Sequence, residues 1–164
     1  FLFFICMKLK KFRNAIFAVA YFKSGNDIEY LLLKRKKHWI GWEFPKGGID
    51  LFETKKMAVK REVKEETGLK ILNIKKFHIS GRYRYKKEYK DRKGIFGQKF
   101  SLYAVEVQKS DVKIDKREHS GFKWENFEGA MEKLTWDSQK RCLKIVNKWV
   151  LLKKEPNMVE NRRK

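Results

Sequence analysis

The chain has 164 residues, of which 42% are hydrophobic, 15% aromatic and 37% charged. This length and hydrophobic content suffice for one domain with its own core and exclude a disordered polypeptide. No apolar run reaches the roughly 18 residues needed to span a membrane, so no membrane segment is predicted. The formal net charge of +21 is compatible with a polyanionic partner such as RNA or a nucleotide, although the lysines are spread along the whole chain.

The first six residues, FLFFIC, are apolar but have neither a basic leader nor a small-residue cleavage site, so they match a signal peptide poorly. Met7 offers an alternative start, which would make residues 1–6 an extension of the chain; an edge strand is the other interpretation. Cys6 and Cys142 lack metal-binding or redox spacing, so we expect two free, buried thiols in a protein of the reducing cytoplasm. The three histidines are too scattered to predict a zinc site.

Two strands are predicted at the start of the domain. Residues 14–23 are rich in aliphatic and aromatic side chains and are typical of a buried strand. The sequence Ser-Gly-Asn-Asp at 24–27 is a strong turn signal, and residues 28–33 are expected to complete a hairpin. Residues 34–37 are expected to form a basic loop. The next turn, Pro-Lys-Gly-Gly at 45–48, predicts backbone amides close to a ligand.

A helix is predicted from Thr54 to Thr67, because this segment has no Gly or Pro and consists mostly of good helix formers. Gly68 is the expected C-terminal stop. Glu62, Glu65 and Glu66 have i, i+3 and i+4 spacing, so we expect their carboxylates to share one face. Like charges at i,i+4 destabilise an isolated helix, whereas a hard cation such as magnesium would bind among them. A solvated acidic face is the alternative interpretation.

The second half of the chain is predicted to contain further strands and a terminal helix. Asn126 is a candidate N-cap for a short helix. Residues 137–152 have the apolar spacing of an amphipathic helix, and residues 153–164 are expected to be a frayed tail. This order of elements predicts one α/β domain over residues 1–164, with a mostly antiparallel or mixed sheet. The predicted strands of this half are 70–79, 98–107 paired with the aromatic and basic segment 81–93, and 122–124.

The segment from Gly47 to Leu69 resembles the Nudix box, the signature of the Nudix hydrolases. Its glycine is followed by five residues, Glu53, seven residues, Arg-Glu, an aliphatic residue, one residue, Glu-Glu, one residue, glycine and an aliphatic residue. The preceding Trp-Glu-Phe-Pro-Lys-Gly-Gly at 42–48 resembles the strand and turn that lead into the box. Phe52 is a departure, because many family members have glycine there. The resemblance covers about residues 12–152.

The resemblance implies the Nudix fold, in which a mixed β-sheet is sandwiched between α-helices. It also implies hydrolysis of a nucleoside diphosphate linked to another group, with magnesium as cofactor and manganese as a substitute. Glu62 and Glu66 would be the direct metal ligands, and Glu65 a further ligand or a catalytic carboxylate. Glu53 would be another ligand or the partner of Arg61, and Arg61 would orient the site rather than bind phosphate.

Some family members take an additional carboxylate, as base or ligand, from outside the box. The candidate here is Glu118, because Glu-His-Ser-Gly-Phe-Lys-Trp at 118–124 resembles the corresponding stretch of dinucleoside tetraphosphatases and RNA pyrophosphohydrolases. A glutamate on a surface loop is the alternative interpretation. Lys46 is a candidate phosphate contact, and the backbones of Gly47 and Gly48 are candidate substrate contacts.

The substrate is the harder question. Tyr85 lies 16 residues after Leu69 (85 minus 69), where the diadenosine-polyphosphate subgroup commonly has a tyrosine that stacks on a purine. Tyr83 is a second candidate on the same segment, although ordinary strand packing would explain both tyrosines. The ADP-ribose subgroup would have a proline here, and this chain has none nearby. The first hypothesis is therefore hydrolysis of a dinucleoside polyphosphate, such as diadenosine tetraphosphate, to ATP and AMP.

The second hypothesis is removal of pyrophosphate or a cap from an RNA 5′ end. Residues 42–49 and Gly-Gln-Lys at 97–99 resemble the RNA pyrophosphohydrolases, which makes Lys99 a candidate substrate contact. The basic segment 82–93 would hold a phosphate backbone. A non-catalytic nucleotide sensor is a third hypothesis, but such a protein would normally have lost box carboxylates, and all are retained here.

Overall fold

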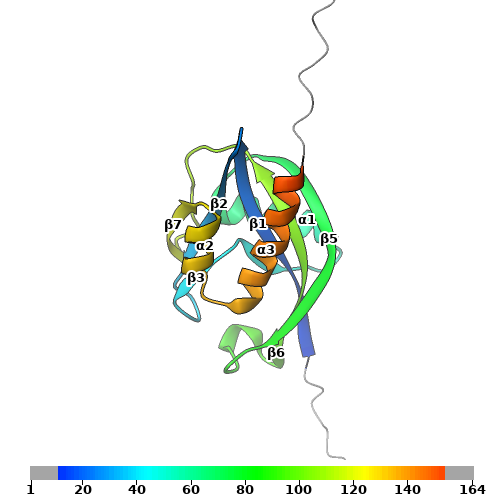
Figure 1. Ribbon diagram of the computed structural model, residues 1–164. Helices are drawn as coiled ribbons and strands as arrows, with labels where there is room; N and C mark the ends of the chain where they lie inside the picture. Colours follow the sequence, from blue (N-terminus) through cyan, green and yellow to red (C-terminus); the bar gives the residue numbers. More distant parts are fainter. Residues whose placement is uncertain (1–10, 154–164) are drawn as a thin grey trace, which may run out of the picture.

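A seven-stranded sheet forms the middle of the molecule, and helices cover both of its faces (Figure 1). The computed structural model describes residues 11–153. The elements in chain order are β1 (Lys11–Ser24), β2 (Asp27–Arg35), β3 (Gly41–Glu43), β4 (Lys46–Gly48), α1 (Lys55–Thr67), β5 (Ile71–Arg84), the 3₁₀ turn η1 (Lys90–Arg92), β6 (Ile95–Val107), β7 (His119–Glu125), α2 (Phe127–Lys133) and α3 (Asp137–Leu152).

The sheet is mixed, as predicted. Its main strand order is β3-β2-β1-β6-β5, with β4 also paired to β1 and β7 also paired to β2. The central pair β1–β6 is parallel, and the other pairs are antiparallel. The predicted hairpin is confirmed, since Ser24 pairs with Asp27 across the turn between β1 and β2.

Alternation along β1 separates two hydrophobic layers. Ile16 faces α1, where it belongs to one buried cluster with Val59 and Val63. The next residue, Phe17, faces the opposite side and belongs to a second cluster with Val146 of α3. Successive side chains of a strand point to opposite faces, so one strand serves both layers. Figure 1 shows the result, with α1 behind the sheet and α2 and α3 in front of it.

Helix α1 has the ends that its sequence predicts. The hydroxyl of Thr54 accepts from the backbone N–H of Met57, and Gly68 ends the helix in the left-handed conformation at φ 69°. Phe52, the departure from the box, also has a positive φ of 64° and is 94% exposed. The turn therefore keeps the backbone conformation that favours glycine, and a bulky residue occupies it without burying its ring.

Two sequence predictions are corrected. Residues 34–37 are not a loop throughout, because Lys34 and Arg35 continue β2, and Arg35 is only 4% exposed. Residues 71–84 form one continuous strand, β5, instead of a strand followed by a separate segment.

Cys142 is a buried free thiol, as expected, and burial raises its pKa to about 12. Residues 1–6, Met7 and the tail from 154 onward lie outside the described residues. No helix in residues 11–153 is long and apolar enough to cross a membrane.

Candidate active site

The three glutamates of helix α1 differ in burial: two are buried and one is exposed. Glu62 and Glu66 are 9% and 4% exposed, whereas the Glu65 side chain is 58% exposed and contacts Arg61 at 3.4 Å. Glu66 Oε2 accepts from the backbone N–H of Lys46 at 3.0 Å. A Cβ added to Gly47 would lie 1.7 Å from Glu62 Oε1, so the glycine makes room for this carboxylate. Lys46 and Gly47, which precede the helix, therefore contact helix α1 at the two buried glutamates.

The two buried carboxylates are electrostatically unsatisfied. Burial raises the pKa of Glu62 to about 7, even though Arg61 lies beside it. Burial, together with the charges of Glu43 and Glu62, raises the pKa of Glu66 well above its ordinary value. A divalent cation would relieve this repulsion, and carboxylate oxygens are the donors that magnesium prefers. The residues present therefore fit a magnesium ion.

The protein donors alone would not complete the coordination of that ion. Among residues 11–153, no three acidic, histidine or cysteine side chains are grouped closely enough to enclose a metal. Magnesium in nucleotide enzymes is usually held by one or two carboxylates, several waters and the phosphates of the substrate. Glu62 and Glu66 are therefore the residues that would hold it, with Glu65 the nearest additional carboxylate on α1.

Arg61 connects the start of the box to its end. Its Nη2 donates to Glu53 Oε2 at 2.8 Å and to the carbonyl oxygen of Gly48 at 2.9 Å, while Nε donates to Glu53 Oε1 at 2.9 Å. Its Nη1 donates to Glu62 Oε1 at 2.7 Å. Arg61 therefore links Glu53 to Glu62 and to the backbone of Gly48, which is the arrangement expected of an orienting residue.

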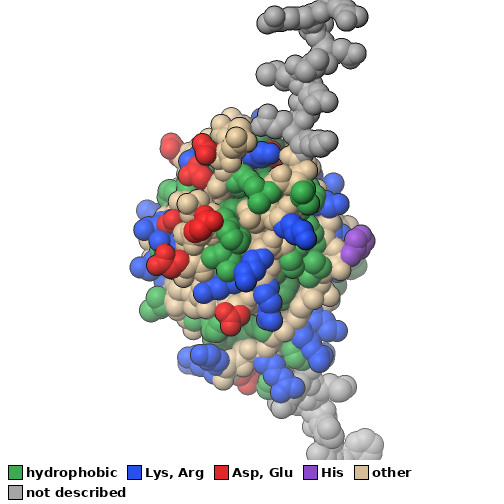
Figure 2. Space-filling view, viewed as in Figure 1, with side chains coloured by type: hydrophobic (Ala, Val, Ile, Leu, Met, Phe, Trp, Pro, Cys, Tyr) green, Lys and Arg blue, Asp and Glu red, His purple; other side chains and the backbone are tan. Residues whose placement is uncertain are grey.

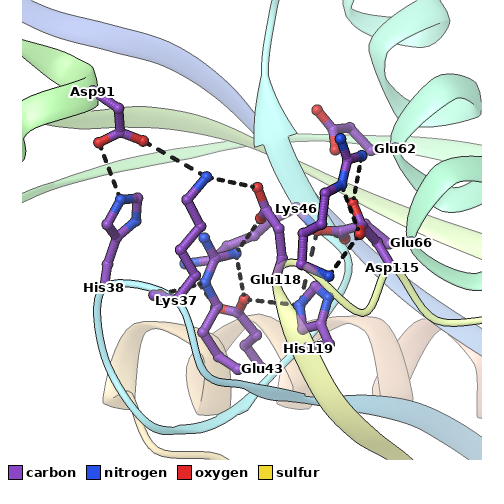
Figure 3. Close-up of polar contacts among 12 residues, drawn as sticks. Lys37, His38, Glu43, Lys46, Glu62, Glu66, Asp91, Asp115, Glu118 and His119 are labelled. Atoms are coloured by element: carbon purple, nitrogen blue, oxygen red, sulfur yellow. Dashed lines mark hydrogen bonds and ion pairs between the residues drawn. The ribbon is translucent and has the colours of Figure 1, made fainter.

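A buried ion network, which the sequence reasoning missed, lies beside the carboxylates (Figure 3). Glu43 is fully buried and contacts Arg35 at 3.1 Å, Lys46 at 2.8 Å and His119 at 3.4 Å. Burial alone would raise the pKa of Glu43, but Lys46, His119 and Arg35 lower it to about 2. His119 Nε2 also lies 3.9 Å from Glu66 Oε1. In the sequence, this network is indicated only by polar or charged residues, Arg35, Glu43 and His119, within strand segments.

Glu118 lies at the edge of this network, not on a free surface loop. Its Oε2 contacts Arg35 at 2.9 Å and its Oε1 contacts Lys37 at 3.5 Å. Although burial opposes it, Arg35 and Lys37 lower the pKa of this carboxyl, so it is ionised at neutral pH. Lys37 also contacts Asp91 at 3.7 Å, and His38 contacts the same carboxylate at 3.1 Å (Figure 3). The loop after β2 is thereby joined to the η1 segment.

A cavity of about 690 Å³ brings six of the twelve candidate residues together. Lys46, Gly47, Glu62 and Glu118 line it at one part of its wall, with Tyr83 and Tyr85 at another. The other six candidates do not line it: Glu66 is buried behind the turn, Gly48 accepts from Arg61, and Lys99 lines a separate cavity of about 380 Å³. Glu53 and Glu65 both contact Arg61, which also donates to Glu62. The expectation that Lys99 contacts the same substrate as Tyr85 is therefore not supported by its position.

The aromatic part of the cavity wall is continuous. The ring centroids of Tyr83 and Tyr85 are 6.0 Å apart, those of Tyr85 and Tyr89 are 5.2 Å apart, and those of Tyr89 and His38 are 4.2 Å apart. Arg92 donates to the hydroxyl of Tyr85 at 3.2 Å. Half-buried rings along a cavity can stack on a nucleobase, because every base has a planar face.

Arg13 and Arg92 also line the cavity, and neither forms an ion pair with a carboxylate of residues 11–153. Within residues 11–153, the Arg13 guanidinium makes no hydrogen bond or ion pair, and burial together with Arg92 lowers its pKa. A Cβ added to Gly48 would lie 2.0 Å from Arg13 Nε, so the arginine lies directly over the turn that precedes the box. Glu62 and Asp50 offset the positive charge of Arg13 only in part, because they form no ion pair with it, so the guanidinium is available to an anion such as phosphate. Figure 2 shows further Lys and Arg side chains around the end of the molecule where β6 begins.

Comparison with known proteins agrees with this geometry. A model of the NUDIX domain matches residues 11–144. The RNA pyrophosphohydrolase of a Nitratiruptor species is 30% identical over 111 residues, which cover 66% of this chain and 72% of that protein. The RNA pyrophosphohydrolase of Baumannia cicadellinicola subsp. Homalodisca coagulata is 32% identical over 117 residues, which cover 63% and 72%.

A crystal structure of a C. elegans Ap4A hydrolase in a binary complex superposes with a TM-score of 0.68. The two sequences are 24% identical, and the match covers 84% of this chain and 97% of the other. At this identity the likeness concerns the fold, which is the predicted sheet between helices.

Proposed function

This chain belongs to the Nudix family of pyrophosphate-bond hydrolases, and we propose that it is a magnesium-dependent enzyme whose main substrates are dinucleoside polyphosphates. Diadenosine tetraphosphate, cleaved to ATP and AMP, represents the class. Membership of the family supports hydrolysis of a pyrophosphate bond, whereas the box does not specify the substrate, which is the proposed part.

One observation carries the proposal: a single cavity holds a buried carboxylate, unpaired cations and an aromatic wall. Glu62 lies at the cavity beside Arg13, and Tyr85 lines the same space. A nucleotide polyphosphate has the complementary parts, namely phosphates that need cations and a base that needs a stacking surface. The volume of about 690 Å³ is within the range of about 300–1,000 Å³ typical of ligand sites.

The reaction replaces one P–O–P link by two phosphate groups. Water adds its oxygen to one phosphorus atom, the bridging P–O bond breaks, and the leaving phosphate departs as an anion. Glu62 and Glu66 would hold a magnesium ion, which would supply positive charge to the phosphate oxygens and acidify the attacking water. Arg13 binds negative phosphate oxygens, and Glu118 is ionised and positioned at the cavity to accept a proton from water.

RNA 5′ ends are the second candidate substrate. Both curated relatives described above carry the name RNA pyrophosphohydrolase. The segment from Lys86 to Arg92 also brings basic side chains to the cavity mouth, where a nucleic-acid backbone would lie. Retention of Glu62 and Glu66 opposes the third candidate, a non-catalytic nucleotide sensor.

Turnover of matched substrates tests the proposal. The protein is incubated with magnesium at low salt, either with diadenosine tetraphosphate or with a short 5′-triphosphorylated RNA, and the products are separated. Release of ATP and AMP at the higher kcat/KM supports dinucleoside polyphosphates. A higher kcat/KM for the RNA, with rates that fall steeply as salt rises, would contradict the proposal and favour the second candidate.

A further inference from the structure

Trp39 and Trp136 form a second aromatic wall of the cavity. Their ring centroids are 5.3 Å apart and their planes meet at 70°, so a flat ligand that stacks on one indole meets the edge of the other. Both side chains are half-buried and line the cavity that also contains Tyr85. Partly exposed aromatic rings that face a cavity provide a stacking surface for a planar ligand.

Capping of α3 does not account for the indole of Trp136. Trp136 occupies the N-cap position of α3, where its backbone carbonyl accepts from Gln139 and Lys140, but its indole makes no capping hydrogen bond. The adjacent Ser138 also lines the cavity, and within residues 11–153 its hydroxyl has no hydrogen-bond partner. Trp39, Trp136 and Ser138 form a corner of the cavity, in which the indole rings can stack on the face of a nucleobase and the serine hydroxyl can hydrogen-bond to its edge.

The backbone at His38 joins this corner to the tyrosine wall. His38 has a φ of 71°, which is uncommon for a residue other than glycine. Its ring lies 4.2 Å from that of Tyr89, while the ring of the next residue, Trp39, contacts Trp136. Two consecutive residues of one loop therefore belong to two different aromatic walls. Unusual backbone conformations concentrate at functional sites, where the surroundings hold them.

Cations lie between and beside the two walls. Lys46 Nζ, which is paired with Glu43, is 5.4 Å from the centroid of the Trp39 ring and 5.9 Å from that of Tyr83. Lys86 Nζ, from the segment after β5, is 5.6 Å from the centroid of the Trp136 ring. Negative groups of a ligand that reaches the Trp136 ring would therefore meet the positive charge of Lys86.

We propose that the Trp39–Trp136 corner binds the second nucleobase of a dinucleoside polyphosphate, while the first base stacks on the wall that includes Tyr85. This inference rests on the proposed function, because it assumes a substrate with two bases linked by phosphates. A ligand with one base leaves the corner empty. Stacking of one additional base increases affinity by about 5-fold to 160-fold, so Trp39 and Trp136 determine the preference for two-base substrates.

Binding to a protein that does not turn over tests the inference. Diadenosine tetraphosphate and adenosine 5′-tetraphosphate, which has the same phosphates and one base, are titrated into the Glu66→Gln protein by calorimetry in magnesium. The titrations are repeated with Trp136→Ala and Trp136→Phe added, and melting temperatures establish that each variant is folded. We expect tighter binding of the two-base ligand, loss of this preference in Trp136→Ala with unchanged affinity for the one-base ligand, and retention of the preference in Trp136→Phe.

Each alternative result has a separate meaning. Equal affinity of the two ligands before Trp136 is changed would overturn the inference and leave the proposed function standing. A preference that persists in Trp136→Ala would do the same. Failure of both ligands to bind the folded Glu66→Gln protein, together with no hydrolysis of diadenosine tetraphosphate by the unmodified protein, would overturn the inference and the proposed function together.

Discussion

The backbone N–H of Lys46 donates to Glu66 Oε2 at 3.0 Å, so the turn before the helix fixes one of the helix carboxylates. The side chain of the same lysine contacts Glu43 at 2.8 Å. Lys46 was expected to contact phosphate, but its ammonium is already paired within the protein. Its position instead connects the buried ion network to the box, and Arg13, which makes no ion pair within residues 11–153, is the cation that we propose to bind phosphate.

Replacement of Gly47 by alanine tests the close approach of β4 to the helix. The new methyl group would lie 1.7 Å from Glu62 Oε1, so the carboxylate must move. We expect turnover to fall about 100-fold, because a displacement of about 1 Å has effects of this size. Gly121→Ala is the matched control, since nothing lies within 4 Å of its added Cβ. Equal activity of the two variants would show that Glu62 has room to adjust.

Replacement of Arg61 by lysine tests the orienting role of the guanidinium. Lysine keeps the charge but cannot contact Glu53, Glu62 and the carbonyl oxygen of Gly48 together. We expect magnesium affinity or activity to fall about 10-fold to 100-fold. The exposed neighbour variant Lys60→Ala should behave as the unmodified protein in a magnesium titration. An Arg61→Lys protein with unchanged magnesium dependence would reject the assigned role.

Replacement of Tyr85 by alanine tests the first stacking wall. We expect KM for diadenosine tetraphosphate to rise about 5-fold to 160-fold, which is the range for loss of one stacked base. Tyr85→Phe keeps the ring and loses only the hydrogen bond from Arg92, so its KM should rise less. Steady-state kinetics of both variants with diadenosine tetraphosphate measure these changes in KM. If Tyr85→Ala lowers the melting temperature and leaves KM unchanged, the tyrosine has only a packing role.

Replacement of Glu43 by glutamine tests the buried ion network through pH. The pKa of Glu43 is about 2 in the folded protein and 4.5 ordinarily, so the folded state favours the ionised form. Its contribution to stability is complete above pH 4.5 and is lost as the pH falls toward 2. We expect Glu43→Gln to lower the free energy of unfolding at pH 7 by about 3–5 kcal/mol, because Arg35 and Lys46 lose a buried partner.

Urea unfolding of the unmodified and Glu43→Gln proteins at a series of pH values measures this effect. The difference in free energy between the two should shrink as the pH falls below 4.5. A difference that stays constant over this range would mean that the Glu43 carboxylate is not held in its ionised form by the network.

Local signals in the sequence were sufficient for the helices. The predicted helix 54–67 begins at Lys55 after its cap and ends at Thr67, and the predicted 137–152 matches α3. Caps, stops and apolar spacing are encoded within a few residues, so they can be recognised without knowledge of the fold. The same spacing predicted that three box glutamates share a face, but burial separates Glu65 from the other two. That separation depends on β4, which lies over only part of the helix face.

Contacts between distant segments could not be predicted in this way. Arg35, Glu43 and His119 come from three different strands, and only the pairing of β2 with β3 and with β7 brings them together. Lys99 was assigned to the substrate by sequence resemblance, but it follows Gln98, which faces the main cavity. Adjacent strand residues point to opposite faces, so Lys99 lines the other cavity.

Magnesium-dependent hydrolysis of diadenosine tetraphosphate by the unmodified, Glu66→Gln and Glu132→Gln proteins tests the central claim most directly. Glu132 is an exposed glutamate of α2, so its variant controls for the loss of one negative charge. The account predicts that the unmodified and Glu132→Gln proteins release ATP and AMP only with magnesium, and that Glu66→Gln does not exceed the protein-free rate. Full activity of Glu66→Gln would contradict the assignment of the reaction to the buried carboxylates of α1.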